Sequence, residues 1–168
     1  MHRPTAAIAV LAALLLAGCS TPTTPPPTAS SEEPAPEPPQ QDGTLDFGET
    51  YTYEDGVTIS VAAPEAFEPG QFAGGADQAH QVTFTFTVTN GSSENLEPSA
   101  YTTVSSGGVE ATPIHDMDQQ VSYDPTTAIL PGQSLSWKRA WSVADLDAIV
   151  LQTTPAMFLY DEIVFTND

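Results

Sequence analysis

The sequence predicts an all-β fold, an antiparallel β-sandwich of about seven to nine strands that occupies residues 45–168. Apolar residues in this region recur with a period of two, which is typical of strands with one buried face. Turn signals such as Asp-Gly, Asn-Gly and Pro-Gly separate these segments at near-regular intervals. No segment shows three turns of helical periodicity, and a domain of this length can bury a core without disulfides.

The chain opens with a predicted lipoprotein signal peptide at residues 1–18. Arg3 supplies a positive start, and Ala6–Leu16 form an apolar run that is shorter than the roughly 20 residues a membrane span needs. The segment Leu16–Cys19 then resembles the bacterial lipobox. That resemblance implies a diacylglyceryl group on the Cys19 sulfur and cleavage just before this residue. The alternative is an ordinary secretory signal with a chance cysteine.

Cys19 is the only cysteine of the chain, so neither an internal disulfide nor a multi-thiolate zinc site can form. Each buried acyl methylene contributes roughly 0.8 kcal/mol, and two or three chains such as palmitate hold a protein on a bilayer. We therefore expect a lipid-anchored, extracytoplasmic protein on the outer face of the bacterial cell membrane.

Residues 19–44 carry the predicted lipidated cysteine and a Pro-rich linker. Eight of the 25 residues in 20–44 are proline, and no aromatic or large aliphatic residue is present. Such a composition cannot bury enough apolar area to offset its ordering entropy, so we expect a disordered stalk. Its prolines favour an extended spacer of about 3.1 Å per residue. A ligand for an SH3-like domain and a glycosylated Ser/Thr stalk are the alternatives.

The segment Gln81–Thr89 is the clearest strand, because Val82, Phe84, Phe86 and Val88 alternate with threonines. An Asn-Gly turn signal follows it. Residues 144–148 could form at most a single helical turn. In chain order the predicted strands are Phe47–Tyr53, Val57–Val61, Gln81–Thr89, Tyr101–Ser105, Val109–Ile114, Leu135–Val143, Ile149–Gln152 and Phe158–Phe165.

Arg139 occupies the apolar phase of its predicted strand, between Trp137 and Trp141. A β-bulge or an edge strand would explain a charged residue there. The other interpretation is a partly buried arginine that pairs with a carboxylate and stacks on one of the tryptophans.

Several segments together resemble the actinobacterial lipoproteins of the DUF4352 family, whose fold is immunoglobulin-like and related to that of the secreted antigen MPT63. These segments are Phe47–Val57, the Val82–Thr89 strand with Asn90-Gly91, the Ile129–Gly132 turn before Trp137-Lys138, and Phe158–Phe165. The resemblance covers nearly all of residues 45–168. It implies an immunoglobulin-like domain at the cell surface with no established enzymatic activity, and it supplies no catalytic residues.

The formal net charge is −19, from 22 acidic residues against three lysines and arginines. Nucleic acid and anionic lipid surfaces both require clustered basic residues, so neither is expected as a partner. A basic protein or a cell-wall polymer would complement the acidic loops better. We expect a monomer that like-charge repulsion keeps soluble.

Asp116, Asp118 and Asp124 are weak candidates for a calcium site. Calcium needs six to eight oxygen ligands, and an EF-hand loop also needs a central glycine and a final glutamate. Both are missing here. Solvated loop acids are therefore the favoured interpretation, with a weak extracellular Ca²⁺ site as the alternative.

Candidate catalytic residues are few. His80 and His115 are the histidines that remain after signal cleavage, and no G-x-S-x-G or phosphate-binding glycine loop accompanies them. We expect no enzymatic activity and no cofactor. The leading hypothesis is a non-catalytic interaction module at the cell envelope. The alternatives are a Ca²⁺- or small-ligand-binding lipoprotein, and a structural or immunogenic envelope protein without a specific ligand.

Overall fold

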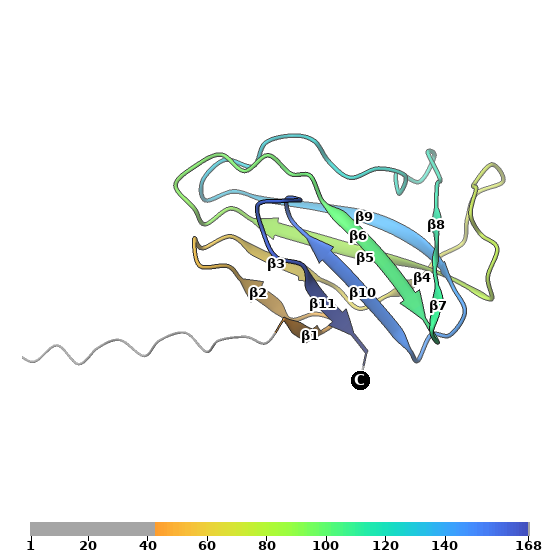
Figure 1. Ribbon diagram of the computed structural model, residues 1–168. Coiled ribbons are helices and arrows are strands. Elements are labelled where there is room, and N and C mark those ends of the chain that lie inside the picture. The colour runs from red at the N-terminus through yellow and green to blue at the C-terminus, as the bar shows by residue number, and fades with distance from the viewer. Residues whose placement is uncertain (1–42, 168) are drawn as a thin grey trace, which may run out of the picture. The chain divides into compact units, whose positions relative to one another are not determined.

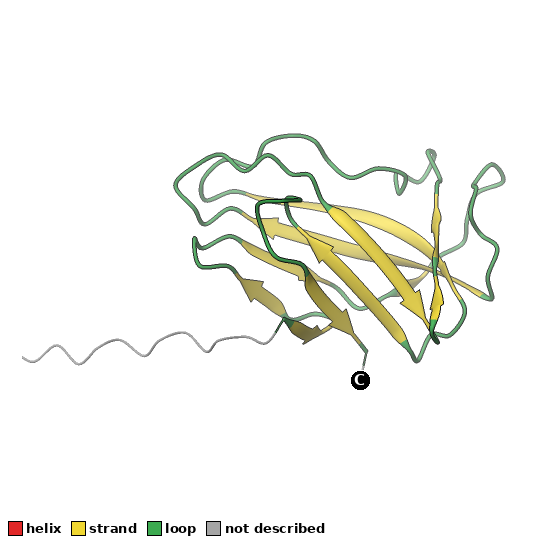
Figure 2. Ribbon diagram, viewed as in Figure 1, coloured by secondary structure: helices red, strands yellow, loops and turns green. Residues whose placement is uncertain are grey.

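The computed structural model describes residues 43–167, which form two packed β-sheets and no helix (Figures 1 and 2). The predicted β-sandwich is confirmed. Five of the strands have only two or three residues, which is why periodicity indicated fewer of them. The strands are β1 (Thr44–Asp46), β2 (Thr50–Thr52), β3 (Thr58–Val61), β4 (Glu65–Ala66), β5 (His80–Thr89), β6 (Tyr101–Ser106), β7 (Val109–Glu110), β8 (Thr112–Ile114), β9 (Ser134–Val143), β10 (Ile149–Thr154) and β11 (Ile163–Thr166).

The strand order is that of an immunoglobulin-like domain. One sheet has the order β1-β11-β10-β6-β7, and the other has the order β2-β3-β5-β9-β8 with β4 added to β5. All pairs are antiparallel except β1 with β11, the first and last strands, which run parallel. Strands β3, β5, β9 and β8 correspond to the A-B-E-D sheet of immunoglobulin domains, and β11, β10 and β6 correspond to G-F-C.

The core lies between the two sheets and is built on the ten-residue strands β5 and β9. Phe84 and Phe86 of β5 and Trp141 of β9 are 0–2% exposed. Leu151 and Phe165 belong to the same buried cluster and come from the other sheet. Burying each such side chain contributes roughly 1.5–3 kcal/mol. The alternation predicted for Gln81–Thr89 therefore supplies the central strand of the fold.

Three predicted strands are wrong in extent. The segment Phe47–Tyr53 contributes only β2, because Phe47 and Gly48 form a turn between β1 and β2. The segment Val109–Ile114 is divided at Ala111 into β7 and β8, which belong to different sheets. The proline of β8 lacks an N–H, and it is tolerated because β8 is an edge strand. The segment Phe158–Phe165 contributes only its second half, as β11, because its first residues form a tight loop.

Asn90 ends β5 as the turn signal predicts, but its side chain is completely buried. Its Nδ2 donates to the carbonyl oxygens of Glu94 and Ile129, each at 2.7 Å. Its Oδ1 accepts from the backbone N and the Oγ of Ser92, at 3.1 and 2.7 Å. One side chain thus fixes the start of the β5–β6 loop against the segment that precedes β9.

Candidate functional site

The register of β5 with β9 is continuous, and β9 lies between β5 and β8. The β-bulge interpretation of Arg139 is therefore wrong. β8 pairs only with residues 140–142 of β9, so Arg139 lies on a stretch of β9 whose one strand neighbour is β5. Its guanidinium Nη1 is 2.6 Å from Asp124 Oδ2, and its Cζ is 5.3 Å from the Trp141 ring centroid. Trp137 Nε1 donates to the other oxygen, Oδ1, at 2.9 Å. Asp124 thus serves as the internal counter-ion of a largely buried arginine.

The Asp116 carboxylate also accepts hydrogen bonds from other groups of the protein. Its Oδ2 accepts from the backbone N of Gly70 at 2.7 Å and from Gln119 Nε2 at 3.1 Å. Its Oδ1 accepts from the backbone N of Asp118 and of Gln119. The hydrogen bond from Gly70, with those from Gln119 and Asp118, lowers the pKa of this carboxyl below its ordinary value. This carboxylate joins the β4–β5 loop to the β8–β9 loop.

The three aspartates proposed as weak calcium ligands are not brought together. Asp118 is exposed, while the Asp116 and Asp124 carboxylates have internal partners. Within residues 43–167, no group of three or more His, Cys, Asp or Glu side chains could hold a metal ion.

Other sequence candidates are placed as follows. His80 and His115 are exposed, at the start of β5 and just after β8. Cys19 and the linker lie outside the described residues, so lipidation stays a prediction. No helix in the described part of the chain is long and apolar enough to cross a membrane.

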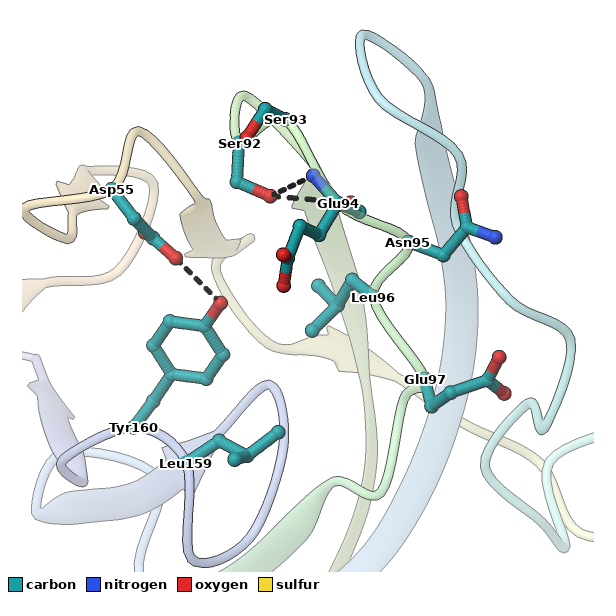
Figure 3. Close-up of a pocket in the computed structure, with 9 residues that line it drawn as sticks. All are labelled: Asp55, Ser92, Ser93, Glu94, Asn95, Leu96, Glu97, Leu159 and Tyr160. Carbon is teal, nitrogen blue, oxygen red and sulfur yellow. Dashed lines mark hydrogen bonds between the residues drawn. The ribbon is translucent and has the colours of Figure 1, made fainter.

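A groove of about 460 Å³ lies at the end of the sandwich where three connections meet. We call this the loop end; it consists of residues 53–57, 90–100 and 155–162, which link β2 to β3, β5 to β6 and β10 to β11. In Figure 3, Asp55 and Tyr160 lie on one side of the groove, Glu94 and Leu96 come from the β5–β6 loop, and Leu159 borders the space below. In immunoglobulin variable domains, two of the corresponding loops bind antigen.

Tyrosine side chains fix one wall of the groove. Tyr160 Oη donates to Asp55 Oδ2 at 2.8 Å, which ties the β10–β11 loop to the β2–β3 turn. Burial and the adjacent Asp55 carboxylate raise the pKa of Tyr160 to about 12, so this donor keeps its proton at neutral pH. The ring of Tyr53 is 4.7 Å from that of Tyr160, and its hydroxyl donates to the Asp161 carbonyl oxygen at 2.8 Å.

Three consecutive apolar residues, Met157–Leu159, project from the tip of the β10–β11 loop. Phe158 is 94% exposed and Leu159 is 72% exposed. The backbone of Phe158 has a φ of 68°, in the left-handed region that is costly for a bulky residue. The buried residue Ala156 holds this turn, because its carbonyl oxygen accepts from the N–H groups of Leu159 and Tyr160, each at 3.2 Å. The tip is therefore a fixed, outward-pointing apolar feature.

The loop end carries only negative charge. Its three segments contain six carboxylates and no Lys, Arg or His: Glu54, Asp55, Glu94, Glu97, Asp161 and Glu162. Lys138 instead pairs with Glu65 at 3.1 Å on the outer face of the β5–β9 sheet. The loop end thus combines an acidic groove with an exposed apolar tip, an arrangement that suits ligand binding more than catalysis.

Sequence reasoning missed this site because the run Phe158–Phe165 fits a strand. One signal was available: Met157–Leu159 are three successive apolar residues, and strict alternation would place at least one of them in water. The left-handed turn that exposes them depends on hydrogen bonds to Ala156 and has no Gly or Asn to mark it.

The fold and the loop end define the chain as an immunoglobulin-like β-sandwich protein. No protein-family model and no curated protein sequence matches it. Several solved structures share the fold. The yjhA protein of Bacillus subtilis has a TM-score of 0.56 at 9% identity, covering 73% of this chain and 99% of that one.

The ycdA protein of Bacillus subtilis, a candidate lipoprotein, has a TM-score of 0.54 at 13% identity, and the match covers 71% of this chain and 38% of that one. The secreted protein MPT63 of Mycobacterium tuberculosis has a TM-score of 0.50 at 14% identity, with 74% and 95% covered. TM-scores of 0.50–0.56 show a common fold, and identities of 9–14% show nothing about shared activity.

Proposed function

We propose that the chain is an extracytoplasmic lipoprotein, anchored through lipid on Cys19, whose β-sandwich is a non-catalytic interaction module. The module binds its partner through the loop end. The observation that carries this proposal is Phe158, an aromatic side chain that is 94% exposed on a left-handed backbone.

Phe158 adds little to the stability of the domain. Its ring buries almost nothing, while a left-handed conformation costs an L-residue roughly 1–2 kcal/mol. Exposed, strained residues of this kind concentrate at binding sites, and aromatic side chains dominate the binding energy of protein interfaces. Because hydrogen bonds to Ala156 already fix the loop, a partner would pay little ordering entropy on binding.

The proposed location rests on the N-terminal signal. The short apolar run, Arg3 before it and the segment Leu16–Cys19 suit a lipoprotein signal. Two proteins of the same fold are a candidate lipoprotein and a secreted protein, which agrees with this location. Membership of the DUF4352 lipoproteins belongs to the same proposal.

Anchoring is tested by expressing the full chain and its Cys19→Ala variant in a bacterium and separating membranes from soluble fractions. We expect the unmodified chain in the membrane fraction with incorporated labelled palmitate, and the variant without label and released. A Cys19→Ala chain that still takes up palmitate would refute lipidation at this residue.

Binding through the loop end is tested by crosslinking on intact cells that display the anchored chain. Phe158→Ala should abolish the crosslinked adduct. Phe72→Ala is the matched control, because Phe72 is 86% exposed on the loop that precedes β5, at the opposite end of that strand. Adducts that persist in Phe158→Ala, or that vanish equally in both variants, would contradict the proposal.

A further inference from the structure

Resting on that proposed function, we infer that the loop end binds a basic peptide segment of a partner protein. An arginine or lysine of the segment occupies the groove, and a neighbouring apolar residue packs on the exposed tip formed by Met157–Leu159.

The groove has an apolar floor and an aromatic wall. Leu96 is 4% exposed and forms the floor, while the Tyr160 ring and the 72% exposed Leu159 border it. Its volume of about 460 Å³ exceeds that of one long side chain. The aliphatic stem of a lysine or arginine can lie along such surfaces while its charged head reaches a carboxylate. A guanidinium can also stack on the tyrosine ring.

Three carboxylates line the groove, those of Asp55, Glu94 and Glu97, and the first two differ in their hydrogen bonds. Asp55 is held by Tyr160 Oη and by the backbone N of Val57, which donates to Oδ1 at 3.1 Å. The Glu94 carboxylate accepts no hydrogen bond from any residue within 43–167, although the Glu94 carbonyl is fixed by Asn90 Nδ2 at 2.7 Å. Glu94 is thus anchored at its backbone with its charge available to a ligand.

No basic group of the domain neutralises this end. Lys138 and Arg139 are paired with Glu65 and Asp124, and both described histidines lie outside the loop-end segments. A cationic ligand would therefore meet no competing basic side chain at the loop end. Six carboxylates around an apolar tip repel nucleic acid and anionic lipid, so a cationic peptide with apolar residues is the occupant that matches both features.

The test uses residues 20–168, which keep every described residue, and isothermal calorimetry with synthetic peptides of about twelve residues. The first alternates Lys/Arg with Phe/Leu, the second alternates Lys/Arg with Ser, and the third alternates Glu with Phe/Leu. We expect the first to bind most tightly, the second more weakly and the third not at all. Raising salt from about 50 to about 300 mM should weaken binding of the first, because exposed charges are screened.

Glu94→Gln should weaken binding of the first peptide about threefold to fivefold, the loss expected for one exposed ion pair. Glu68→Gln is the matched control; Glu68 is exposed on the β4–β5 loop, and its substitution should leave the affinity unchanged. Equal losses in the two variants would reduce the interaction to general charge attraction and overturn the inference. Binding of phosphatidylglycerol vesicles in preference to the peptide would overturn it as well and assign the tip to a membrane.

The two proposals fail separately. If crosslinking on cells depends on Phe158 but no basic peptide binds, the loop end is a binding site for another class of partner and this inference is wrong. If Phe158→Ala alters neither crosslinking nor peptide binding, both proposals are wrong.

Discussion

Replacing Phe158 by glycine should leave the domain as stable as before or more stable, although a large apolar side chain is lost. At 94% exposure, a side chain of roughly 200 Å² buries only about 12 Å², worth about 0.3 kcal/mol. Relief of the left-handed conformation returns about 1–2 kcal/mol. The greater freedom of glycine in the unfolded chain removes about 0.5–1 kcal/mol. The balance is a stabilisation of up to about 1 kcal/mol.

Phe158→Ala is the essential comparison, because alanine removes the ring but keeps the Cβ that makes a left-handed backbone unfavourable. We expect the free energy of unfolding of Phe158→Gly to be about 0.5–1 kcal/mol higher than that of Phe158→Ala. Phe158→Asn should lie between them, since asparagine tolerates this conformation. Urea unfolding followed by tryptophan fluorescence measures the differences. If glycine and alanine are equally stable, the backbone at this position is not strained and the reasoning from strain to function fails.

Three further predictions, at Asn90, Asp124 and Asp116, test the rest of the structure. Asn90→Ala should lower the free energy of unfolding by about 2–4 kcal/mol in urea titrations, because the four hydrogen bonds of this buried amide are lost, each worth roughly 0.5–1 kcal/mol. Asp124→Ala should cost about 1–3 kcal/mol by leaving a 12% exposed guanidinium unpaired, and adding Arg139→Met should recover at least half of that loss, as a double-mutant cycle will show. For Asp116, hydrogen bonds hold the folded-state pKa below 3.8, so its contribution to stability is present above that pH and is lost as the pH falls through the lower folded-state value. Asp116→Asn should therefore flatten the acid limb of the urea midpoint between about pH 5 and pH 2, whereas Asp118→Asn should leave it unchanged.

Strands of the two sheets could be predicted where one face of the strand is buried and the other faces solvent. In β5 the alternation of Phe84 and Phe86 with threonines determines the strand, its inward face and its end at Asn90. Periodicity fails for strands of two or three residues, since these are positioned by their neighbours. The division at Ala111 is such a case, because β7 and β8 pair with β6 and β9 respectively.

The candidate site was less predictable because its parts come together only in the folded chain. The pairing of Arg139 with a carboxylate was a stated alternative, but its partner Asp124 lies fifteen residues away in a loop. Asp116 and Asp124 suggested a metal site because the sequence shows their carboxylates but not the protein groups that donate hydrogen bonds to them. At the loop end, Tyr160 meets Asp55 across a separation of 105 residues, which no local pattern reveals.

The parallel pairing of β1 with β11 has a consequence for how the domain is made. Leu45 lies opposite Phe165 in that pair, and Phe165 also pairs with Leu151 of β10, so β11 lies between β1 and β10 and is not an edge strand. During synthesis or translocation, the sheet keeps an open gap until residue 166 has emerged. Every shorter nascent chain exposes the bare edges of β1 and β10 and the core residues that Ile163 and Phe165 would cover. Closure of the core therefore waits for β11, and products that stop before residue 163 leave core residues open to proteolysis.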